Sequence, residues 1–313
     1  MTKPVANALN KDALYAKSQL YIRKGLARKA SGELEEYQLW ASLSLELLGK
    51  SALASIHPSL IADPQHFQSL FAAAGINVST DIKTITAKTL FERLQHVIDR
   101  FDNKVRVFCN QVANRRNAEL HSGDVPFAAT QTAKWEAEFW YSMDVILGYM
   151  GNTLESWLGA DDATTPQEIL DDAKRAKKQS IEMRVERTRD SFQALKMADR
   201  DAALDKAKTH EARDYPSLFS PFHDNVWECR CPSCGAKAFM GGEMVEEEVT
   251  DTNPDECSVW ETVERSFRGE EFHCPTCSLE LDGYDELEFA ELDPEYSDTD
   301  EREMEYEPEY GND

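Results

Sequence analysis

Apolar side chains recur at helical spacing through the first half of the chain. A leucine-rich stripe lies on one face of residues 35–53, and stripes of the same period follow over about 84–98, 101–120 and 129–158. The last of these is rich in tryptophan, phenylalanine and tyrosine. No segment here alternates with the period of two that strands require. The pattern therefore predicts a mainly α protein that begins with a bundle of four to five helices over residues 1–160.

The pattern changes twice after this bundle. Residues 161–213 are rich in charged residues and alanine, with Pro166 placed to open a helix, and they predict a charged helical linker. Short β-like pieces around cysteines predict a small β domain over 214–285 with an acidic insertion at 241–269. Residues 286–313 combine many carboxylates with almost no aliphatic side chains, so they predict a disordered acidic tail.

Charge is distributed unevenly along the 313 residues, which carry 34 Lys and Arg against 58 Asp and Glu. Almost all of the net charge of −24 belongs to residues 214–313, whereas residues 1–160 are close to neutral. An argument from acidity against nucleic-acid binding therefore applies to the last third only. No apolar stretch approaches the roughly 20 residues needed to cross a bilayer, and the first residues do not resemble a signal peptide. We expect a cytoplasmic protein without a membrane partner.

Four of the seven cysteines form two Cys-x-x-Cys pairs, Cys231/Cys234 and Cys274/Cys277. A tight turn between the members of each pair places both sulfurs on one cation, and two such turns supply four thiolates. A closed shell of four sulfurs is typical of structural zinc and leaves no open position for a reacting water. The spacing predicts a zinc ribbon whose acidic insertion lengthens the chain between the pairs. Its metal has no catalytic role, and its surface could hold a protein partner.

Other residues leave alternatives open at this site. Cys229 could replace Cys231, because Cys229-x4-Cys234 is also a possible clip, although the tighter spacing favours Cys231. A redox Cys-x-x-Cys pair is the competing interpretation, but neither pair opens a helix after a strand as redox motifs do. Cys257 and Cys109 are interpreted as small buried or half-buried side chains.

The second chemical signal is the sequence Arg115-Arg116-Asn117-Ala-Glu-Leu-His121 at the end of the third predicted helix. Arginine and histidine also suit a helix C-terminus because they complement its dipole, so a purely structural role is the competing interpretation. On an ideal helix Arg116 and His121 lie about 140° apart. Asn117 and His121 are four residues apart and share a face, so Asn117 is placed to orient the imidazole or a phosphate.

Arg116-Asn-x3-His121 resembles the Arg-x4–6-His motif of HEPN domains (higher eukaryotes and prokaryotes nucleotide-binding), in which Asn commonly follows the Arg. The surrounding pattern is also similar: an apolar helix with an embedded acidic residue, Glu46, precedes the helix that carries the motif, and a long aromatic helix follows it. The resemblance covers about residues 30–158 and does not extend to the zinc ribbon.

The resemblance implies a metal-independent endoribonuclease, toxin-like or of a phage-defence type, that acts on RNA as a homodimer. In that family both subunits' motifs line one cleft, which would make Arg116, Asn117 and His121 the catalytic residues, with Glu46 as an accompanying acid. Glu46 also stands four residues before Lys50, so an ordinary ion pair on the helix surface is the alternative. For the whole chain, the alternative is a non-catalytic HEPN-like dimeric scaffold, or a protein that only binds nucleotide or RNA.

Overall fold

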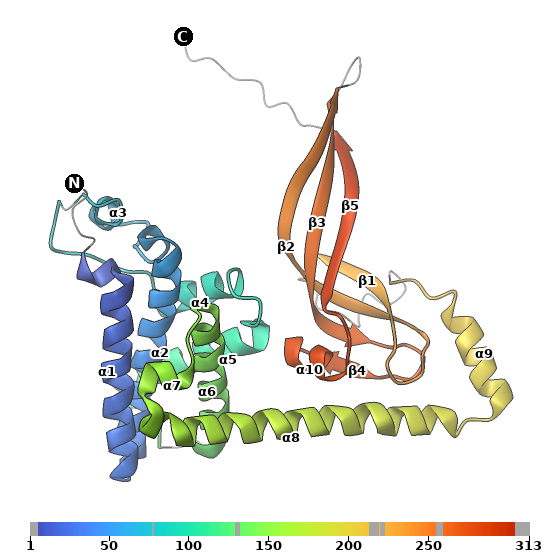
Figure 1. Ribbon diagram of the computed structural model, residues 1–313, viewed down its shortest axis with the longest axis horizontal. Coiled ribbons are helices and arrows are strands. Elements are labelled where there is room, and N and C mark those ends of the chain that lie inside the picture. The colour runs from blue at the N-terminus through green and yellow to red at the C-terminus, as the bar shows by residue number, and fades with distance from the viewer. Residues whose placement is uncertain are drawn as a thin grey trace. The chain divides into compact units, whose positions relative to one another are not determined.

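The computed structural model describes residues 6–76, 78–128, 132–212, 219, 223–254 and 259–303. Its contacts divide the chain within one long helix into two compact units, residues 1–176 and 177–313. The chain is largely helical, with one five-stranded antiparallel sheet in its C-terminal part (Figure 1). Among the described helices, none is both long enough and apolar enough to cross a bilayer.

Unit 1 is built from helices around one apolar core. The elements up to residue 158 are two 3-10 turns, Asn7–Leu9 and Pro58–Leu60, and the helices α1 (Lys11–Ala30), α2 (Leu34–Ile56), α3 (Phe67–Ala73), α4 (Ala87–Gln95), α5 (Asn103–His121), α6 (Thr132–Tyr149) and α7 (Leu154–Leu158). Side-chain oxygens of Asn10, Thr86, Asp102 and Thr153 accept hydrogen bonds from the first turns of α1, α4, α5 and α7. These caps fix where the helices begin.

The four predicted helical segments are confirmed, with one difference. The stripe at 129–158 is two helices, because the chain turns after Tyr149 and Gly151 takes a φ of +70°, which favours glycine. Most large aromatic side chains of this segment face inward: Phe139, Trp140 and Trp157 are fully buried in the core, whereas Tyr149 is exposed. Burying such side chains supplies much of the apolar stabilisation of the unit.

The predicted linker, residues 161–213, is divided between the two units. It forms α8 (Ala160–Gln193) and α9 (Met197–Ala207). Ala163 and Leu170, near the start of α8, belong to the core of unit 1. Ile181 and Val185, farther along the same helix, belong to the core of unit 2. The few apolar residues of this charged segment are therefore its packing contacts, and the chain does not leave it fully solvated.

Unit 2 contains the antiparallel sheet. Its strands are β1 (Asn225–Arg230), β2 (Lys237–Pro254), β3 (Val259–His273), β4 (Glu280–Asp282) and β5 (Glu295–Glu303), in the order β1-β2-β3-β4, with β5 also paired to β3. The predicted acidic insertion, 241–269, forms most of the long hairpin of β2 and β3. The short helix α10 (Tyr284–Phe289) lies between β4 and β5.

The prediction of a disordered tail over 286–313 is wrong for residues 286–303. Leu287 on α10 is fully buried, and the ring of Tyr296 on β5 stacks on Trp227 with centroids 5.0 Å apart. Arg265 on β3 pairs with two carboxylates of β5, Asp298 at 3.2 Å and Asp300 at 2.7 Å. Two apolar anchors and one arginine therefore offset the repulsion among the carboxylates. Residues 304–313 lie outside the described part of the chain.

Candidate functional site

The four predicted ligands lie on two turns with the same backbone pattern. Cys231 begins the turn between β1 and β2, where Gly235 N donates to Cys231 O and Cys231 N donates to Ala236 O, both at 3.0 Å. Cys274 begins the turn between β3 and β4, where Ser278 N donates to Cys274 O at 2.8 Å and Cys274 N donates to Leu279 O at 2.9 Å. Gly235 and Ser278 both adopt positive φ, +74° and +59°. Each turn thereby directs two sulfurs to the same side.

The sulfurs of Cys231, Cys234, Cys274 and Cys277 all lie within 4.8 Å of one another. Cys231 Sγ is 3.6 Å from Cys277 Sγ, and Cys234 Sγ is 3.6 Å from Cys274 Sγ. A disulfide would bring two sulfurs to about 2.05 Å. Four sulfurs on a tetrahedral ion at about 2.3 Å stand about 3.8 Å apart. The sulfur spacing therefore fits a four-thiolate metal centre.

The thiols of this cysteine centre shift one another's pKa. Hydrogen bonds from Cys231, Cys234 and Cys277 lower the pKa of the Cys274 thiol. Hydrogen bonding with Cys234 and the other two thiols raises the pKa of Cys231. A cation bound by the four sulfurs would displace the protons that remain on them.

α8 holds the first turn of the centre in place. Ser233 Oγ donates to Val185 O at 3.1 Å, and Arg189 Nη2 donates to Pro232 O at 2.8 Å. Sequence reasoning missed this support, although polar residues beside each cysteine pair and arginines on the charged helix were visible. Such outer contacts orient the ligands of a metal site.

Two other described cysteines, Cys229 and Cys109, do not belong to the centre. Cys229 on β1 lies outside the group of four close sulfurs, whereas Cys231 belongs to it. Burial, with the charge of Cys274, raises the pKa of Cys229 to about 12. Cys109 on α5 is fully buried, as predicted, and burial raises its pKa to about 12. Cys257 falls outside the described residues.

Glu46 and Arg116, two of the predicted catalytic residues, meet in a largely buried ion pair between α2 and α5. Glu46 Oε2 is 2.8 Å from Arg116 Nη2, and Glu46 Oε1 is 2.7 Å from Lys50 Nζ. Lys50 also donates to Thr84 Oγ1 at 2.9 Å. Burial raises the pKa of Glu46, but the charges and hydrogen bonds of Lys50 and Arg116 outweigh it, so the net pKa is below the usual value. Glu46 is therefore an ionised bridge between two cations.

Asn117 and His121 do not take part in this ion pair. Both side chains are exposed, and neither forms a side-chain hydrogen bond or ion pair with any described residue. His121 is the last residue of α5, just before the turn at Ser122. The side chains of Arg116 and His121 point in different directions because the helix period turns Arg116 toward α2 and the His121 imidazole toward solvent. A single copy of the chain thus brings Glu46 and Arg116 together, but it does not bring His121 to them.

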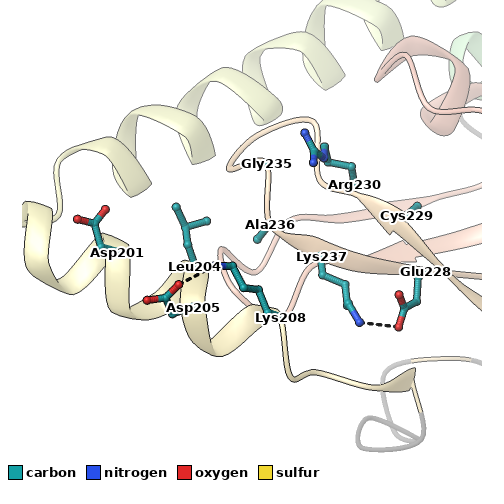
Figure 2. Close-up of a pocket in the computed structure, with 10 residues that line it drawn as sticks. All are labelled: Asp201, Leu204, Asp205, Lys208, Glu228, Cys229, Arg230, Gly235, Ala236 and Lys237. Atoms are coloured by element: carbon teal, nitrogen blue, oxygen red, sulfur yellow. Dashed lines mark hydrogen bonds and ion pairs between the residues drawn. The ribbon is translucent and has the colours of Figure 1, made fainter.

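An open pocket of about 850 Å³ lies within unit 2, between α9 and the β1–β2 hairpin (Figure 2). Its charged side chains are partly paired with one another: Lys208 with Asp205 at 2.8 Å and Lys237 with Glu228 at 2.7 Å. Neither Arg116 nor His121 lines it. The pocket is therefore separate from the residues that the motif predicts to be catalytic.

Comparison with known proteins gives no further guide to function. The chain matches no protein family, and it has no significant similarity to a curated protein or to a solved structure.

Proposed function

We propose that this chain is a HEPN-type endoribonuclease that cleaves RNA without a catalytic metal, through Arg116 and His121 of two paired copies. The support is the arrangement on α5, where Glu46 anchors Arg116 while Asn117 and His121 stay exposed and form no side-chain bond with the described residues. An anchored guanidinium and an accessible imidazole are the two groups that phosphodiester cleavage by an internal hydroxyl needs.

Each residue has a defined role in this proposal. The His121 imidazole takes a proton from the 2′-hydroxyl or gives one to the leaving oxygen, since an imidazole can do either. The Arg116 guanidinium stabilises the extra negative charge on the five-coordinate phosphorus. Because Arg116 and His121 of one copy diverge, the imidazole that works with a given arginine comes from the second copy. Asn117 orients the phosphate or the imidazole.

The cysteine centre has a structural role in this proposal, with zinc as its ion. Four thiolates complete the coordination of zinc, so the ion ties the β1–β2 turn to the β3–β4 turn and adds to the stability of unit 2. The supporting observation is the sulfur spacing of 3.6 Å across both pairs. No step of RNA cleavage passes through this ion.

The Glu46–Arg116 contact also favours a second candidate, a non-catalytic dimeric scaffold. A guanidinium already paired with a carboxylate at 2.8 Å has less charge to offer a phosphate. In a scaffold the same contact would only join α2 to α5. The two candidates differ in what removal of the exposed imidazole does.

Cleavage of a labelled, unstructured RNA by the purified full chain in the presence of EDTA separates them. The ribonuclease proposal predicts cleavage by the natural protein and a loss of at least about 100-fold in His121→Ala. His96→Ala is the matched control, because His96 is also an exposed histidine at the end of a helix, α4, and its rate should change less than about twofold. No cleavage by the natural protein, or equal cleavage by His121→Ala, would favour the scaffold.

A further inference from the structure

The outer parts of β2, β3 and β5 form a three-stranded sheet that extends beyond β1, β4 and α10 (Figure 1). In this outer sheet, residues 246–254 of β2 and 297–303 of β5 pair with residues 259–266 of β3. Directly opposed residues of antiparallel strands point to the same face, so the register assigns each side chain to one of two faces.

On one face, arginines offset part of the acidic charge. This face carries both arginines of the outer sheet, Arg265 and Arg302. Arg265 pairs with Asp298 and Asp300, while Arg302 pairs with Glu247 at 2.8 Å and with Glu261 at 3.2 Å. On this face, therefore, each arginine pairs with two carboxylates of other strands and offsets part of their charge.

The opposite face, which we name the carboxylate face, has no basic residue. Its acidic members are exposed and form no ion pair with any described residue: Glu246, Glu248, Asp251, Glu264, Glu301 and Glu303. The acidic residues of the outer sheet are thus divided between its two faces, whereas both arginines lie on the face opposite the carboxylate face. The sheet leaves the charge of this face uncompensated.

Two details show that the carboxylate face is not arranged for stability alone. Glu248 and Glu264 stand directly opposite each other across β2 and β3, and like charges in that position destabilise a sheet. Trp260, on the same face, keeps 42% of its side chain exposed and is flanked in the register by Glu303. An exposed indole beside carboxylates offers a cation both a ring face and opposite charge.

The spacing of the carboxylates selects the class of partner. Among the described residues, only the four cysteines are close enough together to hold one ion, so these carboxylates do not form a cation site. Alternate residues of a strand are about 7 Å apart, which is also the spacing of every second side chain in an extended peptide. Nucleic acid would be repelled by this face.

We infer that the carboxylate face of β2, β3 and β5 is a docking surface for a basic polypeptide segment, whose lysines or arginines lie over the carboxylates and over Trp260. The partner is extended where it crosses the face, with basic residues at every second position. This interaction does not depend on ribonuclease activity.

Fluorescence anisotropy of a labelled 12-residue peptide of alternating lysine and serine, titrated with the full chain at low salt, tests the inference. The triple variant Glu248→Gln, Glu264→Gln, Glu301→Gln should bind at least about tenfold more weakly than the natural protein, or about 1.4 kcal/mol. A matched triple variant on α8, Glu168→Gln, Glu186→Gln, Asp190→Asn, removes the same charge from exposed residues that form no ion pair. Its affinity should change less than about twofold.

The outcomes separate a docking face from general acidity. Equal losses in the two triple variants would show that only the net charge matters and would overturn the inference. So would the absence of binding by the natural protein at about 50 mM salt, or equally tight binding of an alternating glutamate and serine peptide. Trp260→Ala should weaken binding further without changing its salt dependence, because the ring contributes no net charge.

Discussion

Replacement of Glu46 by alanine is expected to destabilise unit 1 strongly, because it leaves two buried cations without their common partner. The Glu46 carboxylate contacts Arg116 at 2.8 Å and Lys50 at 2.7 Å. The side chains of Lys50, Arg116 and Glu46 keep only 9%, 14% and 19% of their exposure. After the substitution Lys50 retains Thr84 as a partner, and the two cations repel each other.

The expected loss in the free energy of unfolding is about 3–5 kcal/mol, the cost of breaking a buried ion pair from one side. Glu92→Ala is the matched control. Glu92 pairs with Lys88 at the same i,i+4 spacing, but the two charged atoms are 3.8 Å apart. The side chain of Lys88 is 79% exposed and that of Glu92 is 44% exposed. An exposed pair of this kind contributes about 0–1 kcal/mol.

Urea unfolding followed by circular dichroism at 222 nm measures both losses. The lowered pKa of Glu46 fixes the pH dependence: its contribution is fully present above the unfolded value of about 4.3 and is lost as the pH falls through the folded pKa. The difference between the natural protein and Glu46→Ala should therefore shrink below pH 4. A loss of less than about 1 kcal/mol at pH 7, similar to that of Glu92→Ala, would refute the reasoning.

Three further predictions concern the cysteines and the sheet. On the proposal that the four cysteines hold one zinc ion, Cys231→Ser should lower the bound zinc, whereas Cys229→Ser should retain it; mass spectrometry of the metal content decides, and equal retention would contradict the ligand assignment. Cys109, with its pKa raised by burial to about 12, should resist iodoacetamide at pH 8 until the protein is unfolded, and rapid labelling of the native chain would contradict its burial. Gly242→Ala should lower the melting temperature by several degrees, because its Cβ would overlap the carbonyl of Arg268; an unchanged melting curve would count against the β2–β3 register.

The helices that the sequence could predict are those with a wide apolar stripe. α2, α4 and α5 bury leucines, valines and phenylalanines at regular spacing. The apolar pattern did not predict α1. Its buried positions are Leu14, Ser18, Ile22 and Gly25, and because Ser18 is polar and Gly25 is small they do not form a continuous apolar stripe. The hydroxyl of the buried Ser18 accepts a hydrogen bond from Trp157 Nε1 at 3.1 Å, so its polar group has a partner in the core. A contact between residues this far apart leaves no periodic signal in the sequence.

The cysteine centre was predictable because its ligands occur in two local turns. The structure of residues 286–303 was not predictable, since α10 depends on the burial of Leu287 and β5 on pairing with residues of β3 that lie 27 to 43 positions earlier in the chain. Arg265 supplies the charge that this acidic segment lacks, and composition alone does not reveal that complement. The i,i+4 pair of Glu46 and Lys50 was visible in the sequence, but the third partner, Arg116, required the fold.

The most direct test of the ribonuclease proposal compares two forms of one RNA as substrates of the natural protein. One form is all-ribose, and the other has a 2′-deoxyribose at the position of cleavage. The proposal predicts that the all-ribose RNA is cut to a product ending in a 2′,3′-cyclic phosphate, and that the deoxy substitution abolishes the cut. Cleavage at the same position in the deoxy form would contradict attack by the neighbouring hydroxyl, and with it the roles of His121 and Arg116.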